Sequence, residues 1–183
     1  MPESNKLRQQ YYELLPKLTQ VMQIVTNILK PLNDCIIETN FKPFSSVIRK
    51  MSVRHLNNML DLSDLVRGRL FFPVSRTHAE IIRELSELFK KYIKDIDWKS
   101  MTNHGLQYEG VIHFDLNIDG INFELQVMPI EFKPYKEKLH QVYDLLRTNN
   151  SLSDKQKNRL KKLHNTTYRI LNEMAFKNRN IIP

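Results

Sequence analysis

Apolar residues recur every three to four positions along the first 32 residues, which is the period of an amphipathic helix. The stripe consists of Leu14, Leu15, Leu18, Met22, Val25, Ile28, Leu29 and Leu32. This pattern predicts a long N-terminal helix over residues 5–31. Pro16 stands inside the range and has no backbone N–H to donate, so we expect it to kink the helix or to mark a second start.

Later segments alternate between helical and strand patterns. Residues 41–51 predict a short helix, and residues 64–73 predict a strand closed by Pro73, because they are rich in β-branched and aromatic side chains. The helical period returns over residues 76–92, 135–147 and 153–176.

The segment 110–129 alternates apolar and polar residues around Asp119-Gly120. This dipeptide favours a two-residue hairpin turn, because both positions take positive φ, and the turn fixes the register of an antiparallel hairpin. The expected pairs on the polar face are Asn117 with Asn122, Asp115 with Glu124, and His113 with Gln126. Two carboxylates, an imidazole and an amide therefore come together.

With 183 residues, of which 41% are hydrophobic, the composition is typical of one globular domain, so we expect a single folding unit over residues 1–183. No apolar run is long enough to span a bilayer, and the N-terminus lacks the apolar core of a secretory signal. We therefore expect a cytoplasmic protein with no membrane partner. Cys35 is the only cysteine and has no internal disulfide partner.

The net charge of +8 is confined to the last quarter of the chain. Residues 1–132 contain 16 basic and 16 acidic residues, whereas residues 133–183 contain 12 and 4. A basic tail attracts polyanions such as RNA. A solvated lysine-rich helix face explains the same excess, and both interpretations stay open.

The facing Asp115 and Glu124 need an explanation, because like charges opposite one another destabilise a sheet. A divalent cation is one explanation, since Mg²⁺ prefers one or two carboxylates completed by water and phosphate oxygens. Asp64 can supply a further ligand if its strand lies beside the hairpin. The other explanation is a hairpin face turned to solvent.

Basic residues upstream favour a phosphate site near these carboxylates. Ser46 stands near a predicted helix start, where backbone N–H groups hold phosphate oxygens. The basic residues in or beside the short elements are Lys42, Arg49, Lys50, Arg67 and Arg69. Anion-binding residues together with metal-binding carboxylates suit phosphoryl transfer. The sequence contains no Walker loop, dinucleotide fingerprint or HExxH motif.

Four segments in order, KPFSSVIRKM, DLVRGRLFF, YEGVIHFDL and FELQVMP, resemble the synthetase domain of the RelA/SpoT family over residues 40–147. The resemblance implies an α+β fold with a nucleotidyltransferase-like mixed sheet between N-terminal and C-terminal helices. It implies a Mg²⁺-dependent pyrophosphokinase that moves pyrophosphate from ATP to a ribose 3′-hydroxyl. The acceptor is GDP or GTP, or tRNA as in toxin-type relatives, and a toxin implies an antitoxin partner.

The resemblance assigns roles to matching residues. The residues that match the ATP-binding positions are Lys42, Ser46, Lys50, Arg67 and Arg69. Those that match the magnesium-binding and catalytic positions are Asp64 and Glu124, with Gln126 beside them, and Glu124 also activates the acceptor hydroxyl. Those that match the acceptor-binding positions are Tyr108 and His113. The basic residues that would hold a tRNA are Lys155, Lys157, Arg159, Lys161 and Lys162.

Departures from the family pattern keep an alternative open. Asn40 stands where many members have an arginine, Tyr108 matches the base-stacking tyrosine only with one inserted residue, and the stretch 127–129 replaces an arginine and a threonine. The segment with His140, Tyr143 and Arg147 looks like toxin-type relatives. The alternative is a catalytically inactive module that binds nucleotide, RNA or a partner protein.

Overall fold

The computed structural model describes residues 2–97, 102–103, 106–107 and 110–179. In chain order its elements are α1 (Pro2–Leu29), β1 (Ile36–Phe41), α2 (Phe44–Arg54), η1 (Met59–Asp61), β2 (Val66–Phe72), α3 (His78–Leu88), β3 (Ile93–Asp97), β4 (Thr102–Asn103), β5 (Leu106–Gln107), β6 (Ile112–Ile118), β7 (Ile121–Pro129), η2 (Ile130–Phe132), α4 (Lys133–Thr148) and α5 (Asp154–Arg179). The expected α+β class is confirmed.

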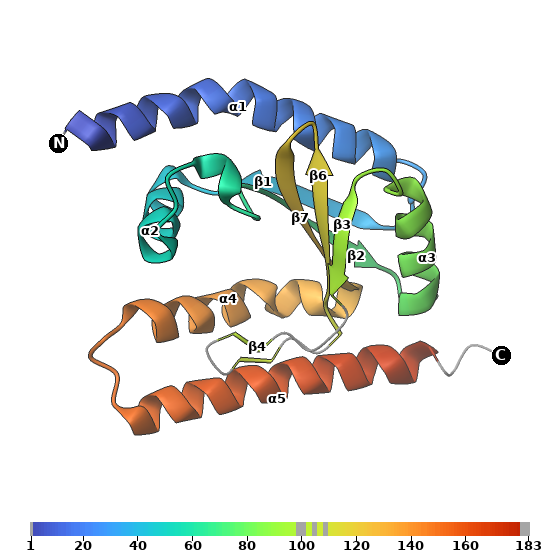
Figure 1. The fold of residues 1–183 in the computed structure, drawn as a ribbon. Coiled ribbons are helices and arrows are strands. Elements are labelled where there is room, and N and C mark those ends of the chain that lie inside the picture. Colours follow the sequence, from blue (N-terminus) through green and yellow to red (C-terminus); the bar gives the residue numbers. More distant parts are fainter. Residues whose placement is uncertain (1, 98–101, 104–105, 108–109, 180–183) are drawn as a thin grey trace.

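A five-stranded mixed sheet in the order β1-β2-β7-β6-β3 forms the centre of the fold (Figure 1). Strands β2 and β7 run parallel, and the other neighbouring pairs run antiparallel. The parallel pair matters for the site, because it places the segment that begins at Val66 beside the second strand of the hairpin.

The hairpin register expected from the sequence is confirmed residue by residue. Asp115 pairs with Glu124, and His113 pairs with Gln126. The turn residues Asp119 and Gly120 have φ values of 51° and 80°, as the turn type requires.

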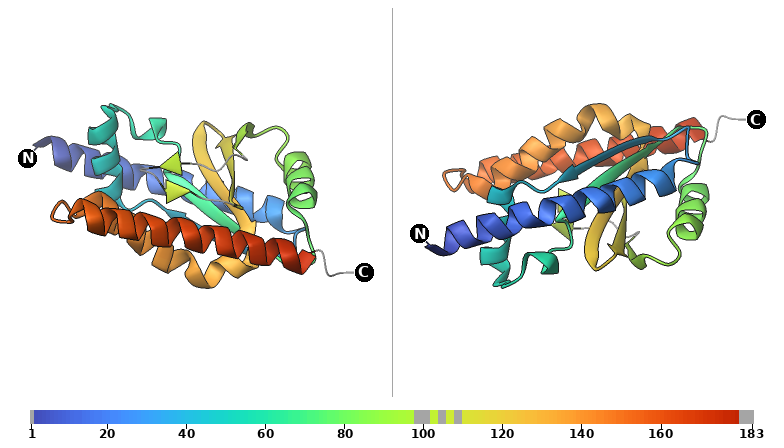
Figure 2. Two further views of the ribbon diagram at one scale, coloured as in Figure 1. Left: turned by 90° about the horizontal axis from the view of Figure 1, so that it is seen from below. Right: turned by 90° about the horizontal axis from the view of Figure 1, so that it is seen from above.

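The two faces of the sheet have different partners. The core face packs against α1, α2 and α3 and is mostly apolar, with fully buried residues such as Phe114, Phe123 and Leu125. The other face, which we call the polar face, lies toward α4 and α5 (Figures 1 and 2). One end of the polar face is apolar too, since Phe71 and Met128 pack there in a second buried cluster with residues of α4 and α5.

Several helix predictions hold, and some details were wrong. Helix α1 continues through Pro16 from Pro2 to Leu29, so no second start occurs there. The last helix lies at Asp154–Arg179, close to the expected range. Strands β1 and β3, which form the two edges of the sheet, were not expected. None of the described helices is both long and apolar enough to cross a membrane.

Candidate functional site

Lys42, Asp64 and Lys50 form a buried ionic cluster at one end of β1 and β2. Asp64 Oδ2 accepts a hydrogen bond from Lys42 Nζ at 2.5 Å, and Oδ1 accepts one from Lys50 Nζ at 2.7 Å. Lys42 follows β1, where its N–H bonds the Leu65 carbonyl, and Tyr11 Oη on α1 donates to the Lys42 carbonyl at 2.8 Å. The cluster is therefore held by residues of α1 and α2 and of the segments that adjoin β1 and β2.

Burial and charge oppose one another within this cluster. Burial by itself would raise the pKa of the Asp64 carboxyl, but hydrogen bonds and charges from Lys42 and Lys50 lower the pKa below its ordinary value. Burial lowers the pKa of Lys42, and Asp64 offsets part of that effect. Asp64 is therefore ionised at neutral pH, and its negative charge is shared by two ammonium groups.

Strands β2 and β7 bring a second group of polar side chains together on the polar face. In the parallel register Arg67 lies opposite Glu124, and Arg69 lies opposite Gln126. Across the hairpin, Gln126 pairs with His113. Two guanidinium groups, a carboxylate, an amide and an imidazole thus occupy three neighbouring strands.

Glu124 lies at the centre of this group. Gln126 Nε2 donates to Glu124 Oε1 at 2.9 Å, and His113 Nδ1 lies 4.0 Å from Oε2. Burial lowers the pKa of His113 despite the nearby carboxylate, which favours a neutral imidazole. The pKa of Asp115 is raised, first by burial and then by the charge of Glu124.

Lys136 is a site residue that the sequence analysis missed. It lies on α4 and is 7% exposed, and its Nζ donates to Tyr168 Oη of α5 at 3.2 Å. Its pKa is lowered to about 7, first by burial and then by the charge of Arg69, while Glu124 opposes the shift. A signal was present in the sequence, because Lys136 stands between Phe132 and Leu139 at helical spacing, where a buried apolar residue is expected.

The other expected site residues lie in different places. Ser46 is in the first turn of α2, one turn before Lys50. Tyr108 lies outside the described residues. On the first turns of α5, Lys155, Arg159 and Lys162 are exposed, and Lys161 is half-buried. They lie on α5, whereas the polar-face group lies on β2, β6 and β7.

The donor chemistry at Asp64 and Glu124 fits Mg²⁺, which takes one or two carboxylates and completes its shell with water and phosphate. Among the residues that the structure describes, no three His, Cys, Asp or Glu side chains are arranged to hold a metal. Both Asp64 oxygens are bonded to lysines. A cation at Asp64 therefore requires Lys42 or Lys50 to move away from the carboxylate.

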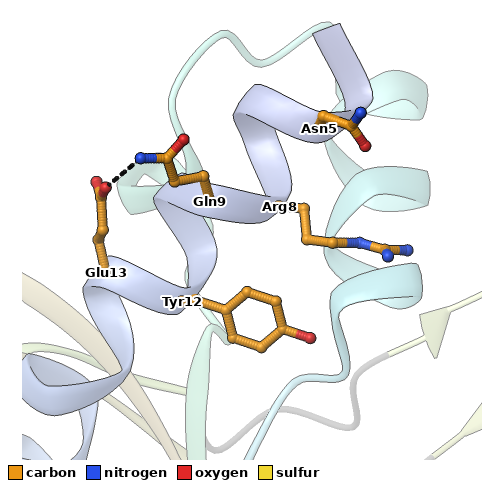
Figure 3. A pocket seen from close by; sticks show the side chains of 5 residues that line it. All are labelled: Asn5, Arg8, Gln9, Tyr12 and Glu13. Atoms are coloured by element: carbon orange, nitrogen blue, oxygen red, sulfur yellow. Dashed lines mark hydrogen bonds between the residues drawn. The ribbon is translucent and has the colours of Figure 1, made fainter. Parts of the chain in front are cut away.

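A pocket of about 550 Å³ lies elsewhere, on the N-terminal half of α1 (Figure 3). Its lining residues are Asn5, Arg8, Gln9, Tyr12 and Glu13. All five come from one helix, and none belongs to the groups described above. The guanidinium of Arg8 also lies over the Phe44 ring at 5.5 Å, which ties α1 to α2. We therefore place the candidate site on the polar face.

Solved structures with the same arrangement of elements include small alarmone synthetase 1 from Bacillus subtilis bound to pppGpp. It has 14% identity and a TM-score of 0.59, and the match covers 97% of this chain and 95% of that one. The Type VI effector Tas1, solved with its immunity protein, has 13% identity and a TM-score of 0.63, with 90% and 96% covered. A GTP pyrophosphokinase family protein from Streptococcus pneumoniae has 15% identity and a TM-score of 0.54, with both chains fully covered.

No protein-family model and no curated protein matches the sequence. The identities of 13 to 15% with these solved structures establish the fold alone. The chain has the fold shared by the small alarmone synthetases and Tas1.

Proposed function

We propose that this chain transfers pyrophosphate from ATP to a ribose 3′-hydroxyl, either of GDP or GTP or at the end of a tRNA. One observation carries the proposal: Arg67 lies opposite Glu124, and Arg69 opposite Gln126, on the polar face. Guanidinium groups bind phosphate oxygens, and a carboxylate accepts a proton. Side chains suited to binding phosphate and to accepting a proton thus lie on adjacent strands, which supports the proposal.

In this reaction the 3′-oxygen attacks the β-phosphorus of ATP. A new O–P bond forms, the bond from the β-phosphorus to the α-phosphate oxygen breaks, and AMP leaves. Glu124 takes the hydroxyl proton on Oε2, because Gln126 occupies Oε1. The arginines and lysines of the site hold the phosphates and offset the charge of the transferred group. Mg²⁺, held by Asp64 and Glu124, would neutralise further phosphate charge.

The matched residues divide between donor and acceptor in this proposal. The residues that bind ATP are Lys42, Ser46, Lys50, Arg67 and Arg69. Tyr108 and His113 hold the acceptor nucleotide. The basic residues at the start of α5 suit a longer acceptor, because exposed cations bind the RNA backbone.

Charge reversal on α5 separates the two acceptors. With tRNA as acceptor, Arg159→Glu should lower transfer to tRNA and weaken its dependence on salt. Transfer to GDP or GTP should stay as in the wild type, since Arg159 is exposed on α5. An unchanged rate with tRNA would exclude this surface as the RNA site.

The reaction is tested with γ-labelled ATP and a panel of GDP, GTP and bulk tRNA. Glu124→Gln keeps the size of the side chain but removes the base, so we expect transfer to fall by about 10²-fold or more. Glu87→Gln is the matched control, because Glu87 is exposed on α3. Wild-type transfer in Glu124→Gln would exclude Glu124 as the base.

A toxin role, with an antitoxin protein as partner, is part of the same proposal. It rests on the likeness to Tas1, which was solved with its immunity protein. ATP and tRNA are both cytoplasmic, so the reaction belongs in the cytoplasm. Expression in a bacterial host should arrest growth with the wild-type chain and not with Glu124→Gln. Equal growth of the two strains would contradict a toxin.

A binding module without catalysis is the second candidate. The observation in its favour is that both Asp64 oxygens are bonded to lysines, so the metal position requires rearrangement. This candidate predicts saturable binding of ATP with no labelled product at any magnesium concentration or with any acceptor. Detection of product would exclude it.

A further inference from the structure

Two aromatic side chains on α4 have no role in the reaction described above. The rings of His140 and Tyr143 are stacked, with centroids 6.0 Å apart and an interplanar angle of 21°. Both residues are partly exposed, and the His140 side chain is 40% exposed. His140 Nε2 lies 3.3 Å from Asp144 Oδ2, which restrains the orientation of the imidazole. We call these two side chains the ring pair.

The position of α4 places the ring pair beside the phosphate-binding arginines. Lys133 at the start of α4 reaches Glu38 of β1 at 2.8 Å, and one turn later Glu137 bonds Arg69 of β2 at 3.2 Å. His140 follows Glu137 by three residues, so it lies on the same side of the helix. Figure 1 shows α4 running along the sheet on this side.

The charges around His140 agree with this placement. Burial lowers the pKa of His140, Asp144 opposes the shift, and the guanidinium groups of Arg67 and Arg69 lower the pKa further. The imidazole is therefore neutral at neutral pH and offers a π-face rather than a charge. The charge of Glu137 acts in the same direction as that of Asp144 and raises the pKa of His140.

The side chains in and around the ring pair indicate the class of ligand that binds there. Stacked rings bind flat, unsaturated groups, and nucleobases stack on aromatic side chains whatever their sequence. The nearby guanidinium groups of Arg67 and Arg69 are suited to binding phosphate. A molecule that carries both a base and phosphates is a nucleotide. Asn40 of β1 is close to one of these arginines but is not aromatic, and its Oδ1 accepts a hydrogen bond from Arg67 Nε at 2.8 Å.

We propose that the ring pair of His140 and Tyr143 stacks against the adenine of ATP while Arg67 and Arg69 hold its phosphates. The identity of the nucleotide rests on the proposed function. The ring pair thereby positions the donor and supplies the contact that distinguishes ATP from a bare polyphosphate. It takes no part in bond making or breaking.

Binding of two ligands separates stacking from charge. ATP and inorganic tripolyphosphate are titrated by calorimetry into the wild-type chain and into His140→Ala, Tyr143→Ala and Tyr143→Phe. Loss of one stacked ring should weaken ATP binding by about 5- to 150-fold and leave tripolyphosphate binding unchanged. Tyr143→Phe keeps the ring and should bind ATP as the wild type does. Tyr135→Ala removes a more exposed ring, 43% exposed, from the same helix and is the matched control.

Three results would overturn the ring-pair proposal. They are equal weakening of both ligands, no weakening of either, and no ATP binding by the wild-type chain. Circular dichroism of each variant verifies that the helix content of the chain is retained. Transfer of label from ATP by the wild-type chain is measured in parallel. If the wild-type chain forms product but the variants bind ATP as tightly as the wild type, the ring-pair proposal is wrong and the proposed function stands. If loss of a ring weakens ATP binding selectively but the wild-type chain forms no product, the ring-pair proposal stands and the proposed transfer reaction is wrong.

Discussion

Replacing Asp64 by asparagine should destabilise the fold and also impair the proposed transfer reaction. The Asp64 and Lys42 side chains are 11% and 10% exposed, and Lys50 is 22% exposed. Asparagine keeps the shape but removes the negative charge that two ammonium groups share. Loss of one partner from a buried ion pair costs about 3 to 5 kcal/mol, because the remaining charge stays buried without compensation.

Water reaches Lys50 more easily than Lys42, so the lower end of that range applies. A loss of about 3 kcal/mol in a chain of this length lowers Tm by roughly 6 to 12 °C. Asp61→Asn is the matched control, because Asp61 is exposed in η1, three residues away. We expect it to change stability by less than about 0.5 kcal/mol.

Thermal unfolding by circular dichroism at neutral pH measures both variants. The pKa of Asp64 is lowered in the fold, so its stabilising effect is present above its unfolded pKa and is lost as pH falls through its folded pKa. The difference between wild type and Asp64→Asn should therefore shrink in acid. Equal Tm values for Asp64→Asn and Asp61→Asn at neutral pH would refute the buried ionic cluster as a source of stability.

Three further substitutions test other parts of the structure by thermal unfolding. Asp115→Asn should raise stability at neutral pH by about 0.2 to 1 kcal/mol, because it removes a charge that faces Glu124; a loss would contradict that repulsion. Gly68→Ala should cost about 1 to 3 kcal/mol, since the new Cβ would lie 2.9 Å from a Phe123 ring carbon, and no loss would argue against the packing there. For Lys136 the pKa falls from 10.5 to about 7, so the unfolded chain binds more protons between these values and wild-type stability should rise with pH there. Lys136→Met should abolish that rise, and an unchanged pH profile would show that Lys136 is not its source.

Local patterns were sufficient for the hairpin and the long helices. The Asp119-Gly120 turn fixes the register by itself, because a slip of one residue would move every apolar side chain to the wrong face. Helix α5 follows from its apolar period alone. The edge strands β1 and β3 carry weaker patterns, since edge residues such as Ile36 and Lys94 are exposed. Their pairing with distant strands decides their conformation.

The sequence determined which residue types carry the candidate chemistry and that Asp115 and Glu124 face one another, since a short hairpin is a local structure. Only the tertiary structure decided that Arg67 lies opposite Glu124, that Lys42 and Lys50 share Asp64, and that Lys136 is buried against Tyr168. These contacts join residues 14 to 57 positions apart in the chain. Their partners are chosen by the packing of the sheet and its helices, which no local pattern encodes.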